Sequence, residues 1–324
     1  MLSPPKTRVI SLLPSATEIL GSIPGGTELL VGRSHEGLRL GRPLRRSITD
    51  RPCLTKQRTT FTTPADVNRQ VSEALALGQS LYTLDVDLLK ALEPEVILAQ
   101  SLCKVCAIDF MSVERVAASM EKTPVVLDLN PNCLGDMLEE VTMIGNAVGL
   151  AQEAQLVLDE LSARIRAVEQ HVLDRGDFVK PRCLVIEWPD PVYVSGHWTP
   201  QIVEMAGGLH PLNSCVKTNA RGEKFARYGR PFTPEEIVDT QAEIIIIAPC
   251  GLDLVETEKQ TNLLAENDWW QQATKQTRAI YLVDGSQMFN RPGPRLVDAL
   301  EFCAGIILDQ PHLIPDGFPY KLWK

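Results

Sequence analysis

The stretch SLCKVCA, residues 101–107, places Cys103 and Cys106 three residues apart after an apolar run that is typical of a β-strand. Such a pair can bind a metal, form a redox-active dithiol at the start of a helix, or pack as thiols in the wall of a cleft. A structural zinc site normally has four ligands, and the sequence contains no second CxxC. We therefore rank packing first, metal binding second and redox chemistry third.

Two of the five histidines each follow an expected strand. A neutral imidazole suits a transition metal such as zinc, or the axial position on a corrin cobalt or a haem iron. Each histidine could equally do no more than hydrogen-bond a neighbouring loop. Four residues could share one metal if they meet across a cleft, with Cys250 as a further thiol. They are His35, Cys103, Cys106 and His197.

Large aromatic and polar residues occupy the same kind of position, directly after expected strands. Trp188 and Trp198 offer flat surfaces on which a macrocycle can stack, or they cap a core. Arg291 can clamp a carboxylate or amide-bearing rim through two N–H groups, or it can point into solvent from a rigid loop. The candidate ligand-binding residues are Ser15, His35, Glu36, Cys103, Glu187, Trp188, His197, Trp198, Cys250, Phe289, Asn290 and Arg291.

These residues need strands and helices to position them, and the apolar pattern predicts an α/β fold. Short β-rich runs alternate with helical patterns, as in an open parallel sheet with covering helices. In such sheets ligands bind outside the carboxyl ends of the strands. In the first part of the chain we expect strands at 8–13, 95–100 and 124–129 and helices at 66–78 and 113–121. A further helix follows Pro14, with Ser15 or Thr17 as its N-cap.

The second part of the chain repeats this plan. A strand at 182–188 and a helix at 199–206 correspond to the first strand and its helix. LEPEVILAQSLC (92–103) matches DTQAEIIIIAPC (239–250), which makes Cys250 the counterpart of Cys103, and TPVVLDLN (123–130) parallels RAIYLVDG (278–285). An internal repeat of this kind predicts two similar lobes.

Between the repeats, residues 134 to about 172 show an almost continuous helical stripe that Gly149 could kink or divide. We expect an N-terminal α/β lobe at 1–131, a long connecting helix at 132–174 and a C-terminal α/β lobe at 175–324. A helix of that length would be a stiff strut between the lobes.

The composition of the 324-residue chain excludes several classes of function. A net charge of −9 argues against a nucleic-acid partner. No stretch has the length of a membrane span, so we expect no membrane insertion. No apolar signal segment precedes the first strand, so we expect a cytoplasmic protein, periplasmic or extracellular only if a leader is missing. The eight cysteines should then be mostly thiols.

Several motifs together resemble the substrate-binding proteins of vitamin B12 and iron-siderophore transport, which have two lobes and a helical backbone. They are LLPSATE (12–18), GRSHE (32–36), SLCKVC (101–106), EWPDP (187–191), SGHWTP (195–200), APCG (248–251) and VDGSQMFNRPGPRLVDALE (283–301). The likeness is to the branch described as cobalamin-binding-like, and it covers nearly the whole chain.

The resemblance implies a small-molecule ligand held in a cleft between two lobes, without catalysis. That ligand would be a cobalamin-like corrinoid, a haem-like tetrapyrrole or another metal chelate, and no cofactor is required. It also implies a monomer that docks an ABC permease only if it is exported. Surface glutamates serve that docking in the family, and Glu18 and Glu204 hold roughly equivalent helix positions here, although they could be ordinary surface residues.

No catalytic motif emerges. The sequence has no GxSxG elbow, no phosphate-binding glycine loop and no HExxH. The preferred interpretation is therefore a non-enzymatic binding protein. Two alternatives stay open. One is an exported solute-binding subunit whose leader is missing. The other is a cytosolic metal-dependent or thiol enzyme that uses His35, Glu36, Cys103, Cys106 and His197.

Overall fold

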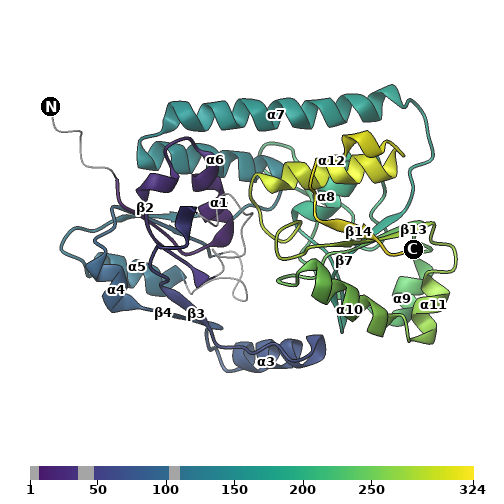
Figure 1. The fold of residues 1–324 in the computed structure, drawn as a ribbon, viewed down its shortest axis with the longest axis horizontal. Coiled ribbons are helices and arrows are strands. Elements are labelled where there is room, and N and C mark those ends of the chain that lie inside the picture. The colour runs from purple at the N-terminus through teal and green to yellow at the C-terminus, as the bar shows by residue number, and fades with distance from the viewer. Residues whose placement is uncertain (1–6, 36–46, 102–109) are drawn as a thin grey trace. The chain divides into compact units, whose positions relative to one another are not determined.

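The computed structural model describes residues 7–35, 47–101 and 110–324. The chain divides into two compact units (Figure 1). Unit 1 comprises Met1–Pro131 and Asp136–Glu160, and unit 2 comprises Asn132–Gly135 and Leu161–Lys324. Each unit is an α/β lobe, as the alternating pattern predicts.

Unit 1 contains a parallel sheet with strand order β2-β1-β5-β6. The central strands β1 and β5 are buried along their whole length, which explains why they are short uninterrupted apolar runs. Ile10 and Ile97 pair in register at the centre of the core. The strands of this sheet are β1 (Val9–Ser11), β2 (Leu30–Arg33), β5 (Val96–Ala99) and β6 (Val125–Asp128), and β3 (Thr55–Gln57) pairs antiparallel with β4 (Tyr82–Leu84).

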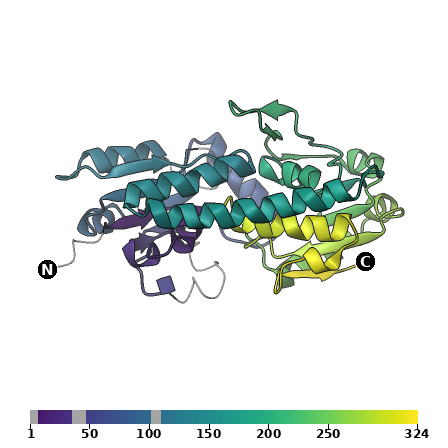
Figure 2. The same ribbon diagram turned by 90° about the horizontal axis from the view of Figure 1, so that it is seen from above.

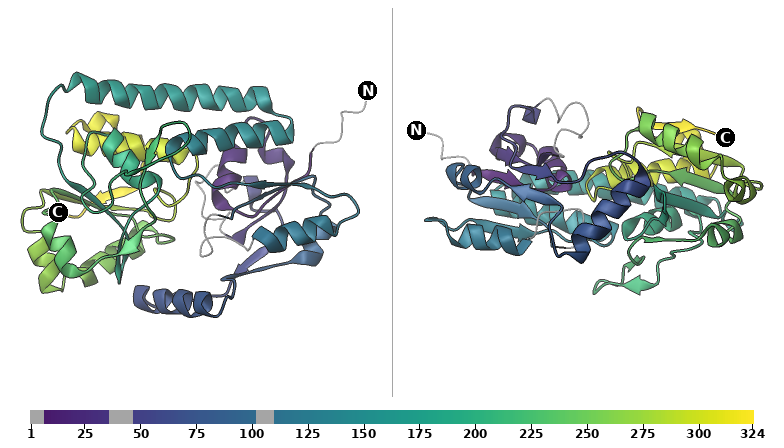
Figure 3. Two further views of the ribbon diagram at one scale, coloured as in Figure 1. Left: turned by 180° about the vertical axis from the view of Figure 1, so that it is seen from behind. Right: turned by 90° about the horizontal axis from the view of Figure 1, so that it is seen from below.

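The helices of unit 1 largely follow the predicted ranges. The first helix begins at Pro14 with Leu13 as its N-cap, so the expected cap by Ser15 or Thr17 is wrong. Proline suits the first helical turn because its missing N–H has no partner there anyway. Figure 3 shows α3 at the end of the β3–β4 ribbon. The helices are α1 (Pro14–Ser22), η1 (Thr27–Leu29), α3 (Pro64–Ala76), α4 (Val86–Ala91) and α5 (Phe110–Ala118).

Unit 2 contains a larger sheet with strand order β11-β8-β7-β12-β13-β14. Its central strands β7, β12 and β13 run parallel, and β12 is four consecutive buried isoleucines. The strands are β7 (Cys183–Pro189), β8 (Val192–Val194), β11 (Arg230–Pro231), β12 (Ile244–Ile247), β13 (Ala279–Val283) and β14 (Tyr320–Leu322), and β9 (Lys217–Thr218) forms a separate hairpin with β10 (Lys224–Phe225). The helices are α8 (Trp198–Met205), α9 (Pro234–Asp239), α10 (Leu254–Leu264), α11 (Asp268–Ala273), α12 (Arg295–Ile307) and η3 (Pro311–Leu313).

The predicted duplication is confirmed down to individual hydrogen bonds. The order β1-β5-β6 in unit 1 repeats as β7-β12-β13 in unit 2. Before the first of these strands, the backbone N–H of Arg8 donates to a carboxylate oxygen of Glu95 at 3.1 Å, and that of Arg182 donates to Glu243 at 2.8 Å. The same two arginines also donate from Nε to a backbone carbonyl just before the second central strand, Arg8 to Leu92 and Arg182 to Gln241.

The strand register corrects the pairing of the cysteines. Val96 and Ile244 both begin the second central strand, so equivalent positions differ by 148 in number. Cys250 follows the end of its strand by three residues, whereas Cys103 follows the end of β5 by four. Cys250 is therefore the counterpart of position 102, one residue before Cys103.

The expected single helix over residues 132–174 is two helices, α6 (Leu134–Val148) and α7 (Ala151–Asp174). Gly149 separates them in a left-handed conformation, with φ of +77°. Within unit 1 the two helices lie side by side (Figures 1 and 2), and a Cβ added to Gly145 would lie only 2.3 Å from Cβ of Ala154. Residues 151–160 of α7 belong to unit 1 and residues 161–174 to unit 2. None of the described helices is both long and apolar enough to cross a membrane.

Candidate functional site

The parallel strands β7, β12 and β13 of unit 2 end at one edge of their sheet, where ligands bind in folds of this type. Three hydrogen bonds join the end of β7, the start of α8 and the segments that follow β12 and β13. The N–H of Cys250 donates to the carbonyl of Glu187 at 3.0 Å. Asn290 Nδ2 donates to the carbonyl of Ala248 at 2.8 Å, and Trp198 Nε1 donates to the carbonyl of Phe289 at 2.6 Å. The structure thus brings together five of the predicted residues, Glu187, Trp198, Cys250, Phe289 and Asn290.

His197 lies at the start of α8, where it is the N-cap residue. Its φ of 53° is unusual for a residue with a side chain, and the backbone holds it there from both sides. The N–H of His197 donates to the carbonyl of Arg227 at 3.1 Å, and its own carbonyl accepts from the N–H of Ala226 at 3.1 Å. Gly196 lies so close to this segment that an added Cβ would be 2.3 Å from the Arg227 carbonyl oxygen.

The imidazole of His197 lies between two aromatic rings. It stacks on Trp198 with ring centroids 5.1 Å apart, and Tyr228 meets it edge-on at 4.6 Å. The Nε2 atom is buried and has no hydrogen-bond partner among the described residues. Burial, and secondarily the charge of Lys217, lowers the pKa of His197 from 6.5 to about 4. The ring is therefore neutral at physiological pH and keeps a nitrogen lone pair that a metal could accept.

Other predicted residues of unit 2 have structural contacts. The ring of Phe289 is 2% exposed and faces Phe302 at 6.4 Å, which places it in the core and does not fit a ligand-contacting ring. Trp188 is half-buried, and its Nε1 donates to the carbonyl of Asp190 at 3.1 Å. Arg291 is 6% exposed, so the alternative in which it points into solvent is wrong.

In unit 1, the predicted residues also lie at the carboxyl edge of a sheet. Ser15 follows β1 and is buried, and His35 follows β2. The N–H of His35 donates to Thr55 Oγ1 at 2.9 Å, and its Nδ1 lies 2.7 Å from the same oxygen. Its ring centroid is 5.3 Å from that of Tyr82. These contacts join the histidine to strands β3 and β4, whereas the alternative in the sequence analysis was a bond to a neighbouring loop.

A polar network that the sequence did not suggest lies at the same edge of unit 1. Ser101 follows β5, and Asp128 is the last residue of β6. The hydroxyl of Ser101 donates to Asp128 Oδ2 at 2.7 Å and accepts from Asn130 Nδ2 at 3.0 Å. The available signal was the presence of polar residues at the ends of two neighbouring strands.

Glu140 on α6 was also missed, because a glutamate in a helical pattern is normally a surface residue. It is 4% exposed, and its Oε1 has no hydrogen-bond partner among the described residues. Burial, with the nearby carboxylates of Asp136 and Asp128, raises the pKa of Glu140 from 4.5 to about 9. The side chain is therefore protonated at neutral pH.

The predicted metal ligands are only partly described. Glu36, Cys103 and Cys106 lie outside the described residues. His35 belongs to unit 1 and His197 to unit 2. The shared metal therefore stays a prediction. A thiol–carboxylate contact that the sequence did not suggest lies within unit 2, where Cys133 Sγ donates to Glu223 Oε2 at 3.4 Å.

The two glutamates expected at a docking surface differ in their surroundings. Glu18 is 7% exposed, so the expectation of a surface glutamate is wrong at this position. Glu204 is half-buried, and its Oε1 accepts from the backbone N–H of Cys215 at 3.0 Å. This bond explains why Glu204 lies against its own unit, and docking stays a prediction for it.

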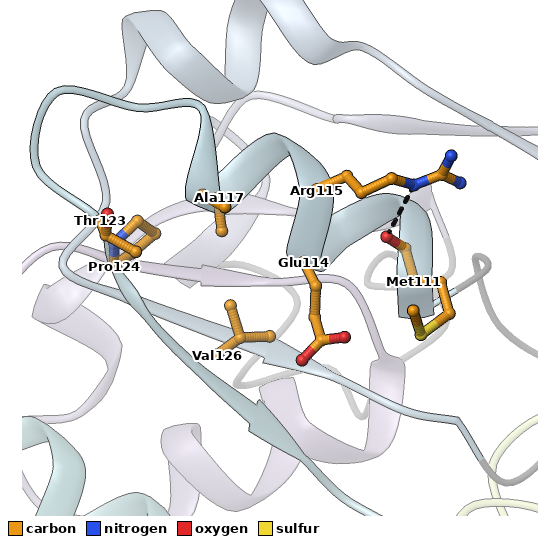
Figure 4. A pocket seen from close by; sticks show the side chains of 8 residues that line it. Met111, Glu114, Arg115, Ala117, Thr123, Pro124 and Val126 are labelled. Atoms are coloured by element: carbon orange, nitrogen blue, oxygen red, sulfur yellow. Dashed lines mark hydrogen bonds between the residues drawn. The ribbon is translucent and has the colours of Figure 1, made fainter.

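A separate hollow of about 510 Å³ lies on unit 1 between α5 and β6 (Figure 4). Met111, Glu114 and Arg115 line one side, and Pro124 and Val126 line the other. None of the predicted ligand-binding residues that the structure describes borders it.

Comparison with known proteins gives the class of fold. No protein-family model matches the sequence, and no curated protein matches it. Solved structures do. The periplasmic haem-binding protein RhuT from Roseiflexus sp. RS-1 in apo form matches with a TM-score of 0.65 at 18% identity, over 96% of this chain and 100% of that one.

Two further structures match over similar lengths. A periplasmic haem-binding protein from Pseudomonas aeruginosa matches with a TM-score of 0.66 at 16% identity, over 94% of each chain. The periplasmic vitamin B12 binding protein BtuF of Vibrio cholerae matches with a TM-score of 0.62 at 14% identity, over 94% of this chain and 98% of that one. The chain has the two-lobed fold of these periplasmic binding proteins, which confirms the resemblance drawn from its motifs at the level of the fold.

Proposed function

We propose that this chain is a non-catalytic binding protein that holds a metal chelate, a corrinoid or a haem-like tetrapyrrole, at the carboxyl edge of the unit 2 sheet. The observation that carries the proposal is the imidazole of His197. It is neutral because its pKa is about 4, and its Nε2 has no partner in the described part of the chain. A metal that accepts this nitrogen would satisfy it.

The surroundings of His197 support a flat ligand. Tyr228 is an exposed aromatic ring that a large planar molecule can stack on or meet edge-on, whereas Trp198 is 7% exposed and supports the imidazole from behind. Tyr228 is 55% exposed, so a ligand can displace its ring and reach the imidazole without opening the core. The likeness of the fold to proteins named for binding haem and vitamin B12 supports the same class of ligand.

Three of the described cysteines, Cys183, Cys215 and Cys303, do not suit a thiol enzyme. A nucleophilic cysteine needs a lowered pKa and access to solvent. Burial raises the pKa of Cys183 to about 12 and raises the pKa of Cys303 well above its usual value, and burial raises that of Cys215 as well. These thiols remain protonated and suit packing.

Titration with haemin and with cyanocobalamin, followed by absorbance, tests the proposal. We expect a one-to-one complex with at least one of them, and a shifted Soret or corrin spectrum that the variant His197→Phe loses. That variant keeps an aromatic ring for packing, and its melting temperature checks that it folds. His312→Phe is the matched control because His312 is exposed.

Three results would overturn or redirect this assignment. If the protein binds neither haemin nor cyanocobalamin, the proposal is refuted. A spectrum unchanged in His197→Phe would remove His197 as the metal ligand. Stoichiometric zinc in the purified protein, without a chromophore and lost in Cys103→Ser, would favour the metal-dependent enzyme instead.

Permease docking and cellular compartment form a separate part of the proposal. The structural neighbours named above are periplasmic, whereas we expect a cytoplasmic chain from the sequence. Fractionation of cells that express the native gene decides between the two. Docking to an ABC permease follows only from an exported protein.

A further inference from the structure

The segment from Val216 to Pro231, VKTNARGEKFARYGRP, is strongly basic. We call it the basic arm. It contains five lysines and arginines and only one acidic residue, in a chain whose net charge is −9. A cluster of one sign in a protein of the opposite net charge creates a local field that attracts an oppositely charged molecule.

The basic arm begins with the β9–β10 hairpin, which projects from unit 2 in Figure 2, and then returns to His197. The return is fixed by the two backbone hydrogen bonds that join His197 to Ala226 and Arg227. Tyr228 follows directly and places its ring 4.6 Å from the imidazole. The arm is therefore held beside the proposed metal ligand by its own backbone.

Lys217 brings a positive charge to the same place. Its Nζ lies 5.7 Å from the ring centroid of Tyr228 and 5.9 Å from that of Phe225. The Lys217 ammonium and the His197 imidazole thus both lie close to the phenol ring of Tyr228.

Two of the five cations are compensated. Arg221 pairs with Glu223 at 2.8 Å, and Arg230 pairs with Glu236 at 3.1 Å. The other three, Lys217, Lys224 and Arg227, are exposed and form no ion pair with a residue in the described part of the chain.

Besides Glu236, which is already paired with Arg230, the carboxylate of Glu187 approaches the arm from outside it. A Cβ added to Gly229 would lie 1.8 Å from Glu187 Oε1, so Glu187 approaches the arm at that residue. One carboxylate does not balance three cations. A compact anion with few charges fits this arrangement better than a polyanion does, because only three uncompensated cations are available.

We propose that the ligand held at His197 is an anionic metal chelate with carboxylates on its rim, and that Lys217 and Arg227 of the basic arm bind those carboxylates. The inference rests on the proposed function and narrows it. It favours a tetrapyrrole that carries acidic side chains over a corrinoid with an amide periphery. Lysine and arginine form charge-assisted hydrogen bonds with carboxylates. These bonds are stronger than the hydrogen bonds that the same side chains form with uncharged amides.

The test measures Kd for haemin, which has two carboxylates, and for cyanocobalamin, whose rim is mostly amides. The variant is Lys217→Ala/Arg227→Ala. The matched control is Lys180→Ala/Lys275→Ala, which removes two exposed lysines of the same unit. All four positions are exposed, so melting temperatures should agree within experimental error.

We expect haemin to bind at least tenfold more tightly than cyanocobalamin. An exposed charge pair contributes a factor of about two to five, so the arm variant should weaken haemin binding roughly five- to twentyfold. Its cyanocobalamin affinity and the affinities of the control should stay unchanged. Raising salt should weaken haemin binding to the native protein more than to the arm variant.

Equal haemin affinity in the native protein and the arm variant would overturn the inference, and so would tighter binding of cyanocobalamin. Either result leaves the proposed function intact, because a chelate is still bound. Failure to bind both compounds refutes the proposed function and the inference together.

Discussion

The indole Nε1 of Trp198 donates a hydrogen bond of 2.6 Å to the backbone carbonyl of Phe289. Trp198 begins α8, and Phe289 lies in the segment after β13. Phe289 has φ of 64°, a left-handed conformation that costs a non-glycine residue about 1 kcal/mol or more. The bond therefore ties together two segments far apart in sequence and helps hold the strained loop that carries Asn290.

Trp198→Phe should destabilise the protein by about 1–3 kcal/mol, because the buried carbonyl of Phe289 loses its donor while most of the aromatic packing remains. Urea unfolding monitored by circular dichroism measures the change. Trp323→Phe is the control, since Trp323 donates to Asn262 in a more exposed setting. An equal loss of unfolding free energy in both variants would mean that the buried bond to Phe289 stabilises the protein no more than the exposed bond of Trp323 does.

Glu140→Gln should stabilise the protein at neutral and alkaline pH. The pKa of Glu140 is 4.5 when unfolded and about 9 when folded, so the native state binds more protons between these values. The free energy of unfolding therefore falls as pH rises through this window, by up to about 1.4 kcal/mol per pH unit.

Glu140→Gln removes this dependence of the unfolding free energy on pH. Urea unfolding of the native protein and the variant at pH 5, 7 and 8.5 measures the difference. The gain over the native protein should be small at pH 5 and reach about 3 kcal/mol near pH 7. The control is Glu139→Gln, one residue away and exposed. A pH-independent difference would show that Glu140 is ionised in the native state.

His197→Phe should flatten the stability of the protein on the acid side. The unfolded histidine takes up a proton near pH 6.5, whereas the folded one does so near pH 4. The unfolded state binds more protons in between, so this histidine makes the native protein less stable as pH falls from about 6.5 to 4. Above pH 6.5 it has no such effect.

The measurement is the melting temperature at pH 7, 6, 5 and 4 for the native protein, His197→Phe and the exposed control His312→Phe. The native protein and the control should lose stability in parallel, and His197→Phe should lose less. A titration of His197 near pH 6.5, seen by NMR in the folded protein, would contradict the prediction.

Gly149→Ala should cost about 1–2 kcal/mol, because a φ of +77° at the junction of α6 and α7 strains any residue with a Cβ. No atom lies within 4 Å of an added Cβ, so the cost is conformational and not steric. Gly149→Asn should cost less, since asparagine tolerates this conformation. Thermal unfolding ranks the three proteins, and equal stability of all three would show that the junction can adopt another conformation.

Much of the fold was predictable from local patterns. The buried strands β1, β5, β7 and β12 are short apolar runs bounded by polar residues, and such runs are visible in a sequence because both faces of a parallel sheet are covered. The duplication was visible because both repeats keep an acidic residue before the second central strand. That residue, Glu95 or Glu243, bonds to the backbone N–H of an arginine in both units.

The candidate site was predictable only as a set of positions. The sequence places His197, Trp198 and Phe289 after strands, where ligands bind in folds of this type. It could not show that the ring of Phe289 points into the core, that Arg291 is buried, or that Glu18 is buried on its helix. The burial of these side chains depends on which face of a loop or helix the neighbouring elements cover. A local sequence pattern does not predict that.

The sequence by itself determined the α/β class, the two similar lobes and the strand ends at which polar residues gather, since these follow from the spacing of apolar residues and turn residues. Tertiary structure alone decided which of those residues meet. It brought residues 226–228 to His197, about thirty positions away, and buried the Nε2 atom of that imidazole and the carboxyl group of Glu140. Burial and the approach of distant charges set the pKa values of His197 and Glu140, and both arise only when the chain has folded.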